Sequence, residues 1–117
     1  MASMDSEQSF HTSLDELMMT IEDRLDEVDI DIDVDGGDGQ LILTFLSGSQ
    51  IVVSRQPAQR EVWVAAKSGG FHLHREEAAW LCATTGETLD VLLNRVVSEQ
   101  AGLEVQAFMG IGAELAQ

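Results

Sequence analysis

The chain has 117 residues, with 21 Asp and Glu against six Lys and Arg, and its net charge at pH 7 is −15. A negative potential of this size repels nucleic acid and anionic membranes and attracts cations or basic protein surfaces. Hydrophobic residues make up 44% of the sequence, which excludes the low hydrophobicity of a disordered chain. We therefore expect one folded domain over residues 1–117, with a core from about 6 to 107 and frayed ends at 1–5 and within 108–117.

Cysteine usage and hydropathy narrow the class of protein further. Cys82 is the only cysteine, so neither an intrachain disulfide nor a cysteine-rich zinc site can form. No apolar run approaches the ~18 residues of a membrane span, and the start of the chain lacks a signal-peptide core. These features favour a reducing compartment, and we expect a cytoplasmic protein.

The first expected element is an amphipathic helix over about 6–27. Its apolar residues recur at steps of three and four, the period of one buried helix face: Phe10, Leu14, Leu17, Met18, Ile21, Leu25 and Val28. Asp5 with Gln8 is the favoured capping pair at its start, and Ser13 with Glu16 is the alternative. The wet face carries two rows of carboxylates: Asp15, Glu22 and Asp26 in one, Glu16, Asp23 and Glu27 in the next.

The segment from Glu22 to Asp35 holds eight carboxylates in fourteen residues. In its second half apolar and acidic residues alternate without a break, which predicts a strand with one buried face and one face in water. Four aspartates then share the wet face about 7 Å apart, where like charges repel: Asp29, Asp31, Asp33 and Asp35. Because this repulsion costs stability, we infer that the acidic side serves a cation or a basic partner.

Short turns separate five further strands, expected at about 40–46, 50–56, 61–66, 71–74 and 80–83. Connections of this length produce an antiparallel meander. A second apolar stripe predicts a helix that ends at Gly102, a residue suited to a helix C-terminus. Both helix stripes and one sheet face are buried together when the helices lie on the same face of the sheet. The expected fold class is therefore α+β, a two-layer sandwich with a five- to six-stranded antiparallel sheet.

The residues beyond Gly102 are too apolar for a free tail. Part of this segment should pack between or beside the helices, and the last residues should fray. The apolar residues concerned are Leu103, Val105, Phe108, Met109, Ile111 and Leu115.

The acidic segment imitates an EF-hand calcium loop but fails its count. With Asp31 at loop position one, Gly36 falls at the glycine position, whereas the last position holds Ile42 in place of the bidentate glutamate. The glycine-rich turn at 36–39 occurs once, whereas repeat-type calcium turns work as arrays. An open carboxylate surface is the better interpretation. It suits hard cations and Fe²⁺ that keeps its waters, at weak affinity and poor selectivity.

The three histidines are further candidates for metal ligands. His72 and His74 share one strand face, but two ligands alone are more typical of ordinary surface residues. His11 lies one to two helical turns from Asp15 and is a candidate ligand of the acidic surface.

Trp63 is expected on the open face of the sheet, because Val62 and Val64 take the buried face. With Arg55 and Gln56 nearby on the preceding strand, it predicts a contact with a protein partner, since Trp and Arg often anchor interfaces. Trp80 and Cys82 are expected to be core residues, and no catalytic base pairs with Cys82 in the sequence.

Taken in order, these motifs resemble the frataxin family in its bacterial form. The resemblance covers about Phe10 to Ala107 and depends on a series of short motifs at matching spacings: Thr20–Asp26, Asp29–Asp31, Gly36-Gly37, Leu43–Phe45, Arg55–Pro57, Glu61–Ala65, Lys67–His72, Trp80–Cys82 and Thr85–Thr88. The family's fold is the same two-layer sandwich that the patterns predict.

The resemblance implies an iron-binding regulator or iron donor in iron–sulfur cluster assembly, not an enzyme, although a weak ferroxidase activity is sometimes attributed to the family. It implies weakly bound Fe²⁺ or Fe³⁺, replaceable by other divalent cations, and docking on the cysteine desulfurase and its scaffold protein. It also implies a monomer that can oligomerise with iron. We name the implied surface the acidic ridge, formed by Asp15, Glu16, Glu22, Asp23, Asp26, Glu27, Asp29, Asp31 and Asp33. The competing hypothesis is an acidic protein-interaction module without a physiological metal.

Overall fold

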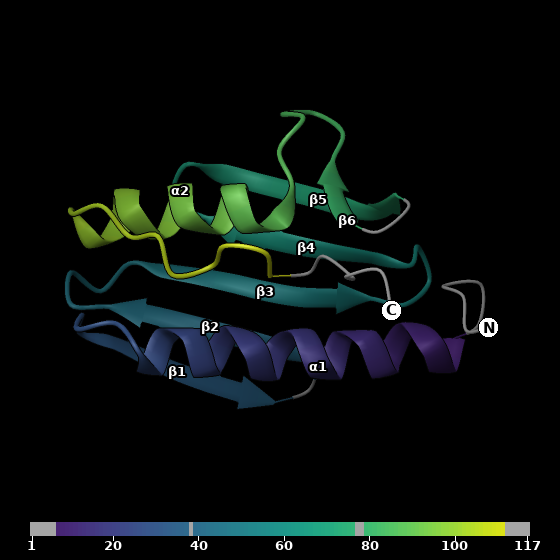
Figure 1. The fold of residues 1–117 in the computed structure, drawn as a ribbon, viewed down its shortest axis with the longest axis horizontal. Helices are drawn as coiled ribbons and strands as arrows, with labels where there is room; N and C mark the ends of the chain where they lie inside the picture. Colours follow the sequence, from purple (N-terminus) through teal and green to yellow (C-terminus); the bar gives the residue numbers. More distant parts are fainter. Residues whose placement is uncertain (1–6, 38, 77–78, 112–117) are drawn as a thin grey trace.

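The computed structural model describes residues 7–37, 39–76 and 79–111 as two helices over one sheet (Figure 1). Six strands join in chain order into a fully antiparallel sheet, β1-β2-β3-β4-β5-β6. The elements are α1 (Glu7–Asp26), β1 (Ile32–Gly37), β2 (Gln40–Phe45), β3 (Gln50–Gln56), β4 (Glu61–Ala66), β5 (Gly69–Glu76), β6 (Ala79–Cys82) and α2 (Leu89–Ala101). Both helices cover the same face, so the predicted two-layer α+β sandwich is confirmed. Within the described residues, no helix is long and apolar enough to cross a membrane.

Helix α1 buries the stripe that its periodicity predicts. Phe10, Leu14, Leu17, Ile21 and Leu25 are each at most 6% exposed, while Met18 and Val28 pack only partly against the core. Burial of one such side chain contributes roughly 1.5–3 kcal/mol, so this stripe fixes the helix on the sheet. The favoured capping residue Asp5 lies outside the described residues, and Ser13 is an interior residue of the helix, so the alternative start at Ser13 was wrong.

In each central strand, alternate side chains face the helices and are buried. Leu41 pairs with Val53, and Val53 with Val64, so that one row of buried side chains crosses three strands. The expected strand bounds agree closely with β2, β3, β4 and β6, while β5 extends beyond the expected 71–74 at both ends.

The acidic strand begins later than expected. Strand β1 starts at Ile32, so Asp29 and Asp31 precede it in an irregular connection. The reason is the register: Ile32 pairs with Phe45, the last residue of β2, and earlier residues have no strand beside them. The alternation persists, with the aspartates exposed, but Ile30, Ile32 and Val34 are only half-buried because β1 is an edge strand.

Helix α2 ends as its glycine predicts. Gly102 adopts a left-handed conformation with φ of 76°, and its N–H donates to the carbonyl of Ser98. Glycine takes this conformation without the steric cost that other residues incur, which allows the chain to reverse here.

After this reversal, residues 103–111, which we call the C-terminal segment, run back between the two helices (Figure 1). Its residues Val105, Phe108 and Ile111 are at most 4% exposed, whereas Leu103 and Met109 are exposed, and Leu115 lies outside the described residues. The expectation that part of this segment packs beside the helices is confirmed.

Polar side chains hold the C-terminal segment in place. Asp90, Asn94 and Ser98 stand four residues apart on α2 and bind its backbone. The Asp90 carboxylate accepts the Gly110 N–H at 3.1 Å, Asn94 Oδ1 accepts that of Phe108 at 3.0 Å, and Ser98 Oγ accepts that of Val105 at 2.8 Å. From α1, Arg24 Nη1 donates to the carbonyls of Ala107 and Met109 at 2.9 and 3.1 Å. The segment is therefore fixed to both helices.

Candidate functional site

The acidic ridge follows the outer side of α1, the connection at 27–31 and the start of β1. All nine of its carboxylates are exposed except that of Glu22, which is half-buried. Asp15 forms an ion pair with Arg55 at 2.8 Å, and within the described part of the chain no other ridge carboxylate has an ion-pair partner. The ridge is thus a nearly uncompensated strip of negative charge.

The ridge is an open surface and not a cage. Across the described ranges, no group of three or more His, Cys, Asp or Glu side chains converges closely enough to hold a metal ion. Exposed carboxylates attract a hydrated cation mainly by charge and replace few of its waters, so such binding is weak and discriminates poorly between metals. The same charge favours the approach of a basic protein surface.

His11 faces Arg55. Its Nδ1 lies 3.0 Å from Arg55 Nη1 and must act as the acceptor, because a guanidinium only donates. Its Nε2 lies 3.8 Å from a carboxylate oxygen of Glu7. His11 and Asp15 thus share Arg55, and the guanidinium stands where a cation would have to bind to use both residues. This arrangement does not favour His11 as a ligand of the ridge.

Arg55 lies on the opposite face of the sheet from Trp63, so the expected grouping of these two residues was wrong. Arg55 pairs with Val62, which is fully buried, whereas Trp63 pairs with Ser54. The guanidinium therefore reaches toward α1. The orientation of Arg55 could have been predicted from the sequence, because alternate residues of a strand share a face and Arg55 alternates with Ile51 and Val53.

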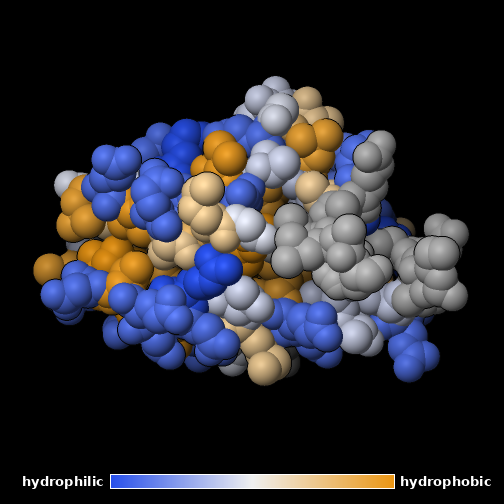
Figure 2. All heavy atoms as spheres, in the orientation of Figure 1, coloured by the Kyte–Doolittle hydropathy of each residue, from blue (hydrophilic) through white to orange (hydrophobic). Residues whose placement is uncertain are grey.

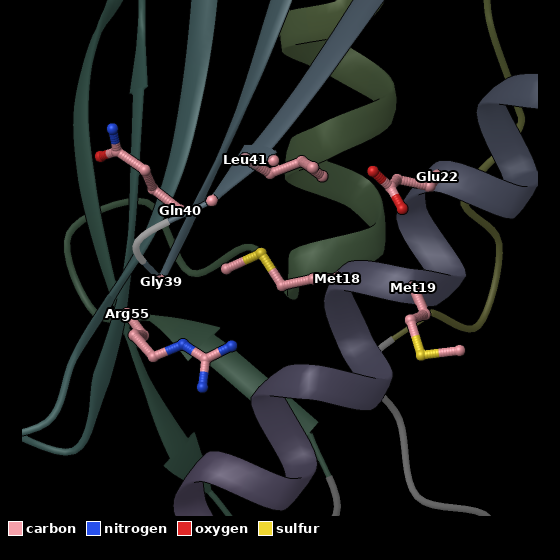
Figure 3. A pocket seen from close by; sticks show the side chains of 9 residues that line it. Met18, Met19, Glu22, Gly39, Gln40, Leu41 and Arg55 are labelled. Carbon is pink, nitrogen blue, oxygen red and sulfur yellow. The ribbon is translucent and has the colours of Figure 1, made fainter.

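Arg55 also lines a hollow of about 390 Å³ beside α1, together with Met18, Met19 and Glu22. Figure 3 shows Glu22 and Arg55 at different sides of this hollow, with the Met18 side chain between them. A Cβ on Gly39 would lie 3.3 Å from Arg55 Cγ, so the close approach of the turn holds the arginine stem in position. Because it contains a guanidinium, the hollow is poorly suited to a cation.

Trp63 lies on the open face as expected, half-buried in a polar and aromatic cluster. Its ring stacks on that of His72 with centroids 4.2 Å apart and an interplanar angle of 8°. The indole Nε1 donates to Glu61 at 2.7 Å. Gln56 shares this face, because it pairs with Glu61, while His74 lies 3.0 Å from Glu76. The open face therefore presents an ordered Trp63 whose ring orientation is fixed.

The shifted pKa values lie away from the ridge. Two hydrogen bonds from Arg95, at 2.8 and 2.9 Å, hold the pKa of Glu87 below its ordinary value. The Asp90 pKa is lowered as well: burial raises it, but hydrogen bonds from Thr88, Gly110 and Val91 outweigh that effect. At Cys82, burial raises the thiol pKa, but hydrogen bonds with Thr84 and Thr85 outweigh that effect, so the pKa is lowered. The Cys82 side chain is fully buried, so the thiol has no access to a substrate.

The fold is thus an open two-layer α+β sandwich that carries an exposed acidic ridge along α1, the connection after it and the start of β1. A model of the frataxin-like domain matches residues 3–103. The chain belongs to the frataxin-like family.

Relatives in sequence carry the name iron–sulfur cluster assembly protein CyaY. The protein of Stutzerimonas stutzeri is 44% identical over 99 residues, which cover 83% of this chain and 90% of that one. The protein of Pseudomonas aeruginosa is 44% identical over 103 residues, covering 86% and 95%, and that of Azotobacter vinelandii is 41% identical over 103 residues, covering 86% and 94%.

Two solved structures share the fold. The frataxin from Psychromonas ingrahamii superposes with a TM-score of 0.80 at 24% identity, covering 87% of this chain and 97% of that one. The trimeric frataxin of the yeast Saccharomyces cerevisiae, described as complexed with ferrous, superposes with a TM-score of 0.65 at 22% identity, covering 77% and 86%.

Proposed function

We propose that the protein serves in iron–sulfur cluster assembly as an iron-binding regulator or iron donor. In this role the acidic ridge binds Fe²⁺ or Fe³⁺ weakly and docks on a basic patch of the cysteine desulfurase. The observation that carries the proposal is the ridge itself: nine carboxylates along α1, the connection after it and the start of β1, all exposed except the half-buried Glu22, and of which Asp15 alone has an ion-pair partner in the described ranges. The names of the relatives, at 41–44% identity, support the pathway.

Weak binding suits a donor. A cation held by exposed carboxylates keeps most of its waters, so it can leave quickly when a partner offers better ligands. Other divalent cations should occupy the same surface, because nothing in an open carboxylate strip selects by size or geometry. Cytoplasmic location, iron-dependent oligomers and a weak ferroxidase activity stay predictions.

A second contact is proposed for the open face. Trp63 is held by His72 and Glu61, so it can bury its ring against a partner at little cost in side-chain entropy. Together with Gln56 it forms the proposed contact with a protein partner. Arg55 is removed from this contact because it faces α1.

The alternative function is an acidic protein-interaction module without a physiological metal. The absence of any convergent metal-binding group in the described part of the chain favours this alternative. It predicts the same docking on basic partners but no specific response to iron.

Titration with Fe²⁺ under anaerobic conditions, followed by backbone amide resonances, distinguishes the two. We expect changes confined to residues 15–35, and they should be much weaker in the triple variant D29N/D31N/D33N. The matched control, E76Q/E99Q/E104Q, removes three carboxylates outside the ridge and should leave the changes intact. Absence of changes within residues 15–35 would contradict the iron proposal and leave the interaction module.

A further inference from the structure

A hollow of about 520 Å³ lies at the end of the molecule where α2 finishes and the β2–β3 turn begins. Its walls come from three separate segments: the connection after α1, the β2–β3 turn, and the end of α2 with the first residue past Gly102. We name it the end groove and define it by Asp29, Ile30, Asp31, Leu46, Ala101 and Leu103.

Two large apolar side chains are exposed in the end groove. Leu46 is 85% exposed and Leu103 is 52% exposed, on opposite segments of the chain, and both line the groove. Figure 2 shows hydrophobic surface gathered at this end of the molecule, bordered by hydrophilic side chains. A second hollow, of about 320 Å³, continues past Leu103 and shares Asp29 and Ile30 with the first. Adjoining apolar hollows of this kind typically mark a site of interaction.

The charge around the groove identifies the chemistry of its occupant. Asp29 and Asp31 form one edge, Glu104 stands beside Leu103, and no Lys or Arg lines either hollow in the described ranges. Because a second copy would bring the same carboxylates and another net charge of −15, like charges disfavour a dimer through this end. A basic segment with apolar side chains satisfies both the apolar walls and the acidic edge.

We infer that the end groove binds a protein segment in which large apolar side chains are flanked by Lys or Arg residues. Its apolar side chains fill the space between Leu46 and Leu103, and its basic side chains reach Asp29, Asp31 and Glu104. The inference rests on the docking half of the proposed function, since Asp29 and Asp31 belong to both surfaces. It adds an apolar anchor that gives an otherwise nonspecific acidic ridge a preference for one sequence pattern.

The probe for this inference is a synthetic peptide with a central Leu-Leu pair flanked on both sides by lysines. Its matched control replaces the two leucines with serines and keeps the charge. Backbone amide resonances of the full-length protein report the site of contact, and the titration gives the affinity. We expect the leucine peptide to bind about tenfold more tightly than the serine peptide, because burial of even one leucine contributes this much. It should shift the amides of residues 45–47 and 101–103.

The double variant L46S/L103S should abolish this tenfold preference. Both side chains are exposed, so the substitutions should leave the fold intact, and the V91S variant, which changes another exposed apolar residue, should retain the preference. Equal binding of both peptides would overturn the end groove and leave ridge docking in place. Binding of neither peptide at low salt would contradict both. If the native protein formed a dimer and the L46S/L103S variant were a monomer, the groove would be occupied by a second copy, and this result would also overturn the proposal.

Discussion

The acidic ridge and the C-terminal segment use polar groups in opposite ways. In the C-terminal segment, Asp90, Asn94 and Ser98 each accept a backbone N–H, and the polar groups are satisfied within the chain. On the ridge the carboxylates point into water, and only Asp15 has a partner in the described part. Groups satisfied internally stabilise the fold, whereas groups left unpaired remain available to bind something outside it.

The largest loss of stability is expected from a substitution at Phe108, in the C-terminal segment. This ring is fully buried, and its N–H is bound by Asn94. Phe108→Ala should lower the free energy of unfolding by about 3–5 kcal/mol, because it leaves a cavity between the helices. Urea unfolding measures the loss. The neighbouring Met109→Ala, at a 61% exposed position, should change stability little, and equal effects of the two would show that the segment is not part of the core.

The ion pair of Glu87 with Arg95 is also satisfied within the fold, so it should make the free energy of unfolding depend on pH. Since the pKa of Glu87 is lowered from about 4.5, the folded state gains stability that is fully present above that value. The gain is lost as the pH falls through the lowered pKa. Glu87→Gln should therefore cost about 1 kcal/mol at neutral pH, after allowance for the exposure of Arg95, and almost nothing in strong acid. A difference that does not vary with pH would assign the effect to packing.

On the ridge, removing charge should stabilise the protein. The triple variant D29N/D31N/D33N should raise the melting temperature by a few degrees, about 0.5–1 kcal/mol, because it relieves repulsion between exposed carboxylates. Salt or divalent cations should raise the melting temperature of the native sequence in the same direction and have less effect on the variant. Thermal unfolding at several salt concentrations measures both. A melting temperature unchanged by salt would mean that the ridge carries no electrostatic cost.

The smallest expected effect on stability is that of Trp63→Ala. The ring is half-buried on the open face, so its loss should cost under about 1 kcal/mol while weakening the proposed complex with a protein partner. Thermal unfolding and a binding titration separate the two. His72→Ala, which removes only the stacked neighbour, should weaken binding less. A large loss of stability would show that Trp63 belongs to the core.

The sequence predicted the helices and central strands because their burial is one-sided. Periods of two and of three to four residues, as in Ile51 and Val53 or in Leu14 and Leu17, mark the face that water does not reach. It also predicted Gly102 as the end of α2, since few other residues take a left-handed conformation cheaply.

The path of the connection after α1, the anchoring of the C-terminal segment and the end groove depend on contacts that periodicity does not encode. The irregular path at Asp29–Asp31 arises because β2 ends at Phe45, a matter of pairing register. Residues 90, 94 and 98 read as ordinary polar positions on α2 until the C-terminal segment is placed over them. The end groove likewise needs Leu46 and Leu103, 57 residues apart in sequence, to be brought together in space.

Arg24 is the only Lys or Arg in the first 38 positions, surrounded in sequence by carboxylates that it could neutralise. Its guanidinium instead donates to the carbonyls of Ala107 and Met109. The fold thus withholds from the ridge the one counter-ion that this stretch of chain supplies. Beyond Asp15, the ridge can be neutralised largely by groups outside the chain. The net charge of the ridge therefore depends on which cations and partners are bound to it.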